Sequence, residues 1–486
     1  MNLVAAIFDR MGVPPGPLRL QVQTLLRVVH FLKTGFGTSV ASYTSDALHR
    51  IYGVGQGSKA GPVTWAAVSS VLFEAQDLFG VGLSFQNPTR TISHKRHSDG
   101  FVDDTTGYHS QMSRWLRDKP TITNVFQGLR SDAQTWERLL WTSGGLLELS
   151  KCRFYIVYWR FDHDGIGHML SKDELSNPPL LLTEGNTGNL REVDQLDLLD
   201  SFKTLGIHKT VSGDESAQIS AMQQKSDAYA RGHLSVNVTN FEAWTGLFTI
   251  WLGQLIYPLV ATSLTHSSCK IIQSKALNAS LTKCGFSRKT SRAVVFGSPW
   301  FGGLGWRHLY YEQGILHVLL LIKHLRTPGP FHSLLQICLH WYQLVTGVSF
   351  SPLYLPSIRL NYLDSEWLDS TRLFLCHCSA QLVIREIPLP QLHRDGDVCL
   401  MDALLDLALS PLNMKRINSC RLWLRVTSLS DVATLYGDQI ERNAWLGLVA
   451  MPSTDADWPV QDRSHDKVWG LWRKALLDSF CSDPHR

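Results

Sequence analysis

The sequence predicts an α+β protein, with short strands and helices in its first part and mainly helices afterwards. Runs rich in aromatic and β-branched residues, with glycines at their ends, favour strands near residues 97–108 and 153–161. Between residues 216 and 326 the apolar residues instead recur at mainly helical spacing. These observations place the strands before the helical regions in the chain.

Length and composition indicate a globular protein of more than one domain. The chain has 486 residues, of which 44% are hydrophobic and 18% are charged. We expect three regions, residues 1–210, residues 211–330 and a C-terminal, mainly helical region of unknown role at 331–486. A net charge of +4 permits a local basic groove but does not by itself indicate a nucleic-acid-binding protein.

Cysteine usage and hydropathy favour a protein of the nucleus or cytoplasm. The nine cysteines include no C-x-x-C pair, and Cys376–Cys378 is too tight for a usual zinc pair, so reduced thiols are expected. The first ten residues lack the pattern of a signal peptide. Residues 244–264 are long and apolar enough to raise a membrane question, but Gln254 and Pro258 interrupt them. We predict a buried helix pair there and no membrane partner.

The individual elements follow from apolar spacing and from the residues that end each run. Gly12 and the prolines after it end a first helix, and Gly144 with Gly145 ends a later one. The aromatic and β-branched content of residues 153–161 predicts a strong strand. The predicted helices are Asn2–Met11, Pro17–Thr34, Val63–Phe79, Ser131–Thr142 and Ser216–Arg231, and the predicted strands include Thr38–Tyr43, His49–Tyr52 and Arg153–Phe161.

The most informative stretch is His97–Tyr108, which reads H-S-D-G-F-V-D-D-T-T-G-Y. Its aromatic and β-branched residues favour extended chain, and Gly100 and Gly107 suit the bends at its ends. We therefore expect Asp103 and Asp104 in or beside a β-hairpin turn. Neighbouring side chains of a strand point to opposite faces, so only one of the two can face a given site fully.

Two carboxylates on a hairpin are suited to a hard divalent cation. Mg²⁺ prefers oxygen ligands, and a two-metal centre stabilises the attacking and leaving oxygens of a phosphoryl transfer. The simpler interpretation is that Asp103 and Asp104 form a solvated turn.

Four motifs, taken together, resemble those of a known enzyme family. F-V-D-D at Phe101–Asp104 resembles the Y-x-D-D signature, motif C, of reverse transcriptases. Gly53–Pro62, G-V-G-Q-G-S-K-A-G-P, is similar to motif B, although Gly61 stands where that pattern usually has serine. Gly144–Phe154 resembles the motif D region with its lysine, and Phe202–Gly206, F-K-T-L-G, resembles the motif E hairpin. Their order and spacing resemble those of non-LTR-type retroelement reverse transcriptases.

The resemblance implies an RNA-directed DNA polymerase that extends a DNA primer on an RNA template with deoxynucleoside triphosphates. Its fold would be a partial palm, an antiparallel sheet with helices, followed by a mostly helical thumb. Asp103 and Asp104 would hold Mg²⁺ or Mn²⁺, and Lys151 would be the candidate acid for the leaving pyrophosphate. The remaining site residues would be Gln56, Gly57, Gly55 and Phe101 beside template and nucleotide, and Lys203, Leu205 and Gly206 in the primer grip.

Two features of the sequence have alternative interpretations. Gly53, Gly55 and Gly57 before a helix suggest a dinucleotide-binding loop, but Asp77, at the required distance, falls inside the predicted helix rather than at a strand end. Six cations between residues 270 and 292 either track a duplex backbone or form the solvated side of helices. They are Lys270, Lys275, Lys283, Arg288, Lys289 and Arg292.

Polymerase chemistry also needs a third carboxylate, which the family supplies from motif A. That motif precedes the helix leading to motif B, and Met1 already lies in this helix. Asp9 sits in a helical context and is not expected to replace it; Asp99 is a further carboxylate near the pair. We therefore expect a reverse transcriptase truncated at its N-terminus and inactive alone. The alternative is a non-catalytic retroelement remnant or a nucleic-acid-binding module.

Overall fold

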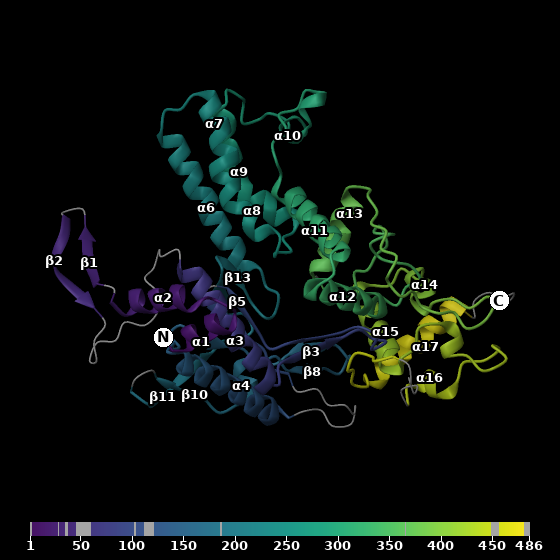
Figure 1. The fold of residues 1–486 in the computed structure, drawn as a ribbon. Coiled ribbons are helices and arrows are strands. Elements are labelled where there is room, and N and C mark those ends of the chain that lie inside the picture. The colour runs from purple at the N-terminus through teal and green to yellow at the C-terminus, as the bar shows by residue number, and fades with distance from the viewer. Residues whose placement is uncertain are drawn as a thin grey trace. The chain divides into compact units, whose positions relative to one another are not determined.

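A computed structural model describes residues 2–27, 29–34, 37–44, 60–101, 104–110, 121–184, 187–364, 366–448 and 456–480 (Figure 1). The chain forms two compact units. Unit 1 comprises Met1–Ser84, Lys95–Ile156 and Lys172–Leu196, and unit 2 comprises Phe85–His94, Val157–Ser171 and Asp197–Arg486. Helices and small, mainly antiparallel sheets confirm the α+β prediction. The three regions predicted from the sequence stay a prediction, because their borders were defined by function rather than by packing.

Unit 1 combines helices, hairpins and one three-stranded sheet. Its elements are α1 (Asn2–Arg10), α2 (Pro15–Arg27), β1 (Val29–Thr34), β2 (Gly37–Thr44), α3 (Ala60–Phe79), β5 (Ser98–Phe101), β6 (Asp104–Gly107), α4 (Ile122–Ser143), β7 (Arg153–Phe154), α5 (Lys172–Leu175), β10 (Leu180–Glu184) and β11 (Asn189–Gln195). Strand β11 pairs with β10 antiparallel and with β7 parallel. Helices α1, α3 and α4 share a core that includes Phe8, Leu72 and Trp136.

Two predictions for unit 1 need correction at their ends. The predicted helix Pro17–Thr34 ends at Arg27, and Val29–Thr34 is strand β1, paired antiparallel with β2. The β-branched and aromatic side chains of Val29 and Phe31 favour a strand when a partner strand is present. The predicted helix Ser131–Thr142 begins earlier, at Ile122, because the hydroxyl of Thr121 accepts a hydrogen bond from the backbone of Asn124.

The predicted strand Arg153–Phe161 is also wrong in its middle. Only its ends pair: β7 with β11 in unit 1, and β8 (Trp159–Phe161) with β9 (Gly167–Met169) in unit 2. A strand is stabilised by ladder hydrogen bonds, so aromatic content alone does not extend it where no partner lies alongside. By contrast, the predicted helix Val63–Phe79 is confirmed within α3, and Gly144 ends α4 in a left-handed conformation, φ 85°.

Unit 2 is mainly helical, as predicted for the second part of the chain. Its longer helices are α6 (Ser216–Ser235), α9 (His266–Lys283), α11 (Leu309–Arg326), α12 (Pro330–Thr346), α13 (Trp367–His377), α15 (Pro411–Leu424) and α17 (Asp466–Phe480). Its shorter elements are β12 (Phe202–Thr204), β13 (Ile207–Lys209), α7 (Asn240–Gly246), a π-helical segment (Leu247–Leu252), α8 (Gly253–Leu259), α10 (Arg292–Phe296), α14 (Leu400–Leu405) and α16 (Arg442–Leu446). Helices α6 and α9 lie side by side (Figure 1).

The apolar stretch at residues 244–264 lies in α7, the π-helical segment and α8. Trp251, Leu255 and Leu259 from this stretch are buried in the core of unit 2. The predicted pair of helices is thus a continuous helical run with a π-helical segment inside it, and its burial is confirmed. None of the helices among the described residues is long and apolar enough to cross a membrane.

A buried arginine from another helix donates hydrogen bonds to the C-terminal carbonyls of α12. Arg421 of α15 is completely buried and donates hydrogen bonds from Nη2 to the carbonyls of Leu344 (2.8 Å) and Val345 (2.9 Å). Its Nε donates to Asn418 Oδ1 at 2.8 Å. Burial lowers the pKa of Arg421 to about 10, and the guanidinium still supplies positive charge at the negative end of the helix dipole.

The hairpin of β3 (Leu83–Gln86) and β4 (Ser93–Arg96) ends in a tip that belongs to unit 2. Asn87 in this tip is buried, and its Nδ2 lies 3.0 Å from His340 Nδ1 in α12. The indole of Trp341 donates to the Gln86 carbonyl at 2.7 Å. Asp457 accepts hydrogen bonds from Arg90 and from Gln86, the latter at 2.6 Å. The tip is therefore held by residues that lie more than 250 positions later in the chain.

Candidate functional site

Strands β5 and β6 form the hairpin that was predicted around the two aspartates. Phe101 is the residue opposite Asp104, and Ser98 is opposite Gly107 at the other end of the ladder. Val102 and Asp103 connect these strands in the sequence and lie outside the described residues. The side chain of Asp104 is exposed and makes no hydrogen bond or ion pair with the part of the chain that is described. Phe101 is also exposed, so a carboxylate and a ring meet solvent at this end of the hairpin.

Helix α3 supports the hairpin through a close contact that only glycine permits. A Cβ on Gly100 would lie 2.3 Å from Cζ of Phe73, well inside normal contact distance. The Phe73 ring stacks in turn on Trp136 of α4, with centroids 5.2 Å apart. Strand β5 of the hairpin thus packs on the stacked rings of Phe73 and Trp136, which hold this strand in place.

Asp99 is engaged in a local network beside the hairpin and is not free to act as a ligand. Its Oδ1 accepts hydrogen bonds from Nε of Arg96 at 2.6 Å and from Nη2 of the same guanidinium. Its Oδ2 accepts from the hydroxyl of Tyr108 at 2.8 Å. Burial, together with the bond to Asp99, raises the pKa of Tyr108 to about 12, so this hydroxyl stays a donor.

Two histidine–carboxylate pairs at the hairpin were not predicted from the sequence. Nδ1 of buried His97 lies 2.6 Å from the carboxylate of Asp77, and Nδ1 of His109 lies 2.7 Å from that of Asp132. Burial works to raise the pKa of Asp132. Hydrogen bonds from His109 and from the backbone of Val81 and Gly82 outweigh it, and the pKa falls below its usual value.

These pairs have a structural rather than a catalytic geometry. Asp77 lies inside α3, which confirms the prediction that it falls within a helix and not at the strand end that a dinucleotide-binding loop requires. Asp132 joins α4 to the chain that enters β3, because it accepts from two successive backbone N–H groups, at 3.1 and 3.3 Å. The partners are 20 and 23 residues apart, and no local spacing pattern in the sequence signals such pairs.

The glycine-rich loop predicted to contact template and nucleotide lies outside the described residues. This applies to Gly55, Gln56 and Gly57, whose proposed roles stay predictions. Helix α3 begins at Ala60, directly after that stretch of sequence. A helix that follows such a loop and packs on the hairpin is compatible with the motif B–motif C order, because both motifs then share one support.

The motif E-like sequence forms the predicted hairpin. Strands β12 and β13 pair antiparallel, with Thr204 opposite Ile207. Leu205 (φ 51°) and Gly206 (φ 83°) both lie in the left-handed region, as the tight two-residue turn of a hairpin requires. Lys203 is exposed. This hairpin belongs to unit 2, and Asp104 belongs to unit 1.

Lys151, the candidate acid, lies in a turn just before β7. Its backbone N–H donates to the Glu148 carbonyl at 2.9 Å, and its side chain is exposed. Within the described parts of the chain it forms no ion pair or hydrogen bond with Asp104 or Phe101. The structure thus pairs Phe101 with Asp104 and leaves Lys151 apart from both.

A divalent cation at this site would need more ligands than the described residues supply. Among them, no group of three His, Cys, Asp or Glu side chains is arranged to hold a metal ion. Asp104 offers one oxygen-bearing side chain, and Asp99 is occupied by Arg96 and Tyr108. The described side chains therefore do not form a complete Mg²⁺ or Mn²⁺ site.

The predicted row of six cations is heterogeneous. Lys275 pairs with Asp227 at 2.5 Å, Lys283 donates to the Val236 carbonyl at 2.6 Å, and Arg292 donates to Asn278 at 2.8 Å. The remaining cations, Lys270, Arg288 and Lys289, are exposed and form no ion pair within the described residues. Half of the row is thus tied into the helical structure.

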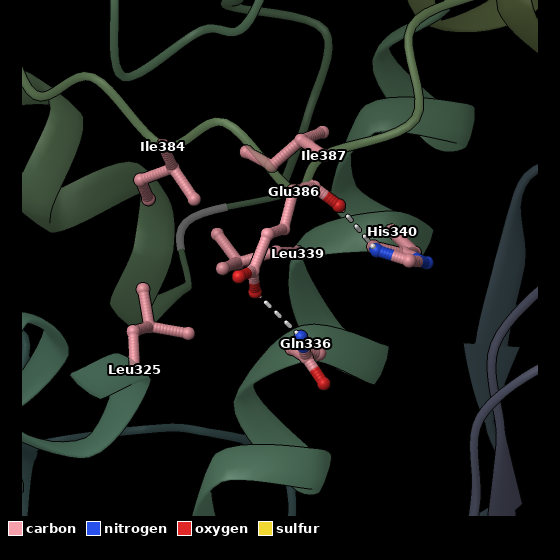
Figure 2. Close-up of a pocket in the computed structure, with 7 residues that line it drawn as sticks. All are labelled: Leu325, Gln336, Leu339, His340, Ile384, Glu386 and Ile387. Atoms are coloured by element: carbon pink, nitrogen blue, oxygen red, sulfur yellow. Dashed lines mark hydrogen bonds between the residues drawn. The ribbon is translucent and has the colours of Figure 1, made fainter. Parts of the chain in front are cut away.

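A recess at α12 does not provide a second candidate site. Figure 2 shows its lining, where Gln336 donates to Glu386 at 2.8 Å and His340 lies 3.1 Å from the Glu386 carbonyl. Its interior has no room for a water molecule, so the residues that line it are simply packed against one another.

Comparison with known proteins yields no relative: no family model, no curated protein and no solved structure matches this chain.

Proposed function

We propose that this chain is the palm-and-thumb part of a retroelement reverse transcriptase, an RNA-directed DNA polymerase. The observation that carries the proposal is the β5–β6 hairpin, whose pairing of Phe101 with Asp104 brings Asp104 to its end. Support for the motif order comes from α3, which follows the glycine-rich stretch and packs on Gly100 through Phe73. The turn at Leu205 and Gly206 gives the motif E-like sequence its hairpin.

The reaction would be nucleotidyl transfer from a deoxynucleoside triphosphate. The 3′-hydroxyl oxygen of a primer attacks the α-phosphorus, a P–O bond forms, and the bond to pyrophosphate breaks. The hydroxyl proton passes to solvent water as the bond forms, and Lys151 is the candidate donor of a proton to the departing pyrophosphate. Bound Mg²⁺ or Mn²⁺ would supply positive charge at the phosphates, and Asp103 and Asp104 are the carboxylates of this chain that would hold it.

Primer extension tests the proposal. The chain is incubated with a poly(A) template, an oligo(dT) primer and thymidine triphosphate, with Mg²⁺ or Mn²⁺, beside an Asp103→Ala variant. Because the sequence supplies no motif A carboxylate beside Asp103 and Asp104, we expect no extension by this chain alone. We expect extension by a longer chain with a motif A segment joined to its N-terminus, and a loss of at least about 100-fold when that chain carries Asp103→Ala, because positioning and charge provide most of the catalysis. No extension by the longer chain with either ion would contradict the proposal.

An Asp9→Asn variant provides the matched control. Asp9 is an exposed carboxylate near the end of α1, remote in sequence from the hairpin, and the same charge is removed. We expect this variant of the longer chain to extend the primer fully. Extension abolished by Asp9→Asn as well as by Asp103→Ala would instead identify Asp9 as the third carboxylate of the centre.

A further inference from the structure

Unit 2 carries two large aromatic side chains that are almost fully exposed. Trp300 and Phe301 form a short 3-10 turn after α10, and their exposed fractions are 93% and 92%. Figure 1 places the α10 segment at an extremity of the helices of unit 2. Neighbouring aromatic rings that bury so little of their surface are costly in water, and such surface commonly marks an interaction site.

The turn that carries these rings is held by close backbone packing. Leu304 and Trp306 donate backbone hydrogen bonds to Val294 (2.8 Å) and Val295 (3.0 Å) of α10. A Cβ on Gly303 would lie 2.2 Å from the Gly297 carbonyl oxygen, so glycine is needed for this approach. The two rings are therefore presented by an ordered loop.

The loop is anchored in the core on both sides. Val295 is completely buried, and Trp306 is buried against Trp244 of α7 with ring centroids 5.8 Å apart. The fold thus buries Val295 and Trp306 but leaves Trp300 and Phe301, within six residues of them, in solvent. Exposure of these rings is a property of the anchored loop rather than of an unfolded segment.

Charge on the same part of the chain indicates the kind of partner. Residues 243–311 contain seven lysines and arginines and no aspartate or glutamate. Arg288 and Lys289, in the segment that enters α10, are exposed and form no ion pair within the described residues. Exposed cations within about a dozen residues of exposed aromatic rings suit single-stranded nucleic acid, since cations neutralise phosphates and the rings stack on unpaired bases.

We propose that Trp300 and Phe301, with Arg288 and Lys289, form a docking site for single-stranded nucleic acid on unit 2. Unpaired bases stack on the two rings, and the flanking phosphates contact the cations. Duplex nucleic acid should bind this site more weakly than a single strand, because its bases are already stacked inside the double helix.

Fluorescence anisotropy with a labelled 20-nucleotide oligo(dT) strand and a labelled 20-base-pair duplex tests the site. The full chain is compared with its Trp300→Ala/Phe301→Ala variant, without metal ions or nucleotides. We expect the variant to bind the single strand at least about 30-fold more weakly, as stacking energies for two rings imply, and the duplex nearly as before. Equal affinity of both proteins for the single strand would overturn the proposal.

A second exposed pair provides the matched control. Leu435 and Tyr436 are 81% and 89% exposed in the C-terminal part of unit 2. Their double alanine variant removes a similar exposed apolar pair and should bind the single strand like the unaltered chain. An equal loss in this control would show a general effect of surface hydrophobicity and would also overturn the proposal.

A charge variant tests the cations independently of the rings. The plot of log affinity against log salt concentration has a negative slope. Arg288→Gln/Lys289→Gln should make this slope less steep by about 1 to 1.5, as the loss of two phosphate contacts implies. An unchanged slope would show that these cations are not part of the site.

Sedimentation with phosphatidylserine–phosphatidylcholine vesicles tests a membrane surface, which is the other partner that cationic, aromatic surfaces can bind. Vesicle binding lost in the ring variant, with oligonucleotide binding unaffected, would identify a membrane surface and exclude the proposed site.

Discussion

His317 illustrates how the core of unit 2 keeps an ionisable residue neutral. The side chain lies in α11 and is completely buried. Its Nε2 is 3.2 Å from the Leu259 carbonyl, and its Nδ1 is 3.2 Å from the hydroxyl of Thr371. Burial lowers the pKa of His317 to about 4, against a partial opposing effect of the backbone carbonyls. The ring therefore serves as a neutral hydrogen-bonding link between helices.

This burial predicts a loss of stability in acid. Between pH 6.5 and about 4 the unfolded chain binds a proton at His317 and the folded chain does not, so the free energy of unfolding falls as the pH falls. We expect a contribution of roughly 3 kcal/mol over this window, measured by urea denaturation at several pH values. A His317→Gln variant should lack that contribution, although it is less stable at pH 7.

The control for this prediction is His168→Gln, at an exposed position of strand β9. It should keep the pH dependence of the unaltered chain. An identical pH dependence in His317→Gln and the unaltered chain would show that His317 is protonated in the folded state or accessible to water.

Among the secondary-structure elements, the β5–β6 hairpin gives the clearest test of packing. Gly100 and Gly107 lie in the same hairpin, yet a Cβ on Gly100 would overlap Phe73, whereas a Cβ on Gly107 would meet nothing within 4 Å. We expect Gly100→Ala to lower the stability of unit 1 by about 1–3 kcal/mol, the usual cost of overpacking. Gly107→Ala, the matched control, should change it by less than about 0.5 kcal/mol.

Hydrogen exchange at the amides of β5 and β6 checks this prediction locally. Faster exchange in Gly100→Ala than in Gly107→Ala would place the effect in the hairpin. Equal exchange in the two variants would show that the Phe73 side chain can move aside without loss of stability, and that the hairpin does not depend on its contact with α3.

The elements that the sequence predicted well are those with local signals. The β5–β6 hairpin follows from glycines beside aromatic and β-branched residues, and the end of α4 follows from Gly144. The β12–β13 hairpin was predicted instead from the resemblance of Phe202–Gly206 to motif E. Strand β1 was predicted as helix because its apolar spacing continues that of α2, and only the partner strand β2 decides between the two structures. Of the candidate site, the sequence predicted the hairpin with Asp104 but not the contacts of Asp99, Asp77 and Asp132, whose partners depend on tertiary packing.

At the scale of the whole molecule, each unit has a hydrophobic core of its own. The core of unit 1 lies between α1, α3 and α4, and unit 2 contains two larger clusters, one of which surrounds Trp469 and Trp472. Separate cores favour separate unfolding steps. We therefore expect two transitions in calorimetry, one for each unit.

Arg421 distinguishes the two transitions. Arg421→Ala would leave the carbonyls of Leu344 and Val345 without their donor and create a cavity, which we expect to cost unit 2 about 3 kcal/mol. Its transition should move to lower temperature while that of unit 1 stays in place. Lys474→Ala, at an exposed position of α17, is the control and should move neither. A shift of both transitions in Arg421→Ala would show that the units unfold together.

The tip of the β3–β4 hairpin has a consequence for synthesis of the chain. Asn87 leaves the ribosome long before His340, its partner 253 residues later. At translation rates of roughly 5–20 residues per second, that interval lasts about 10 to 50 seconds. During this time the buried amide of Asn87 lacks its native partner, although the neighbouring strands of unit 1 have already been made. A nascent chain of this protein therefore carries a hairpin whose tip has no native partner until α12 has been made, and the order of synthesis sets when that tip can become buried.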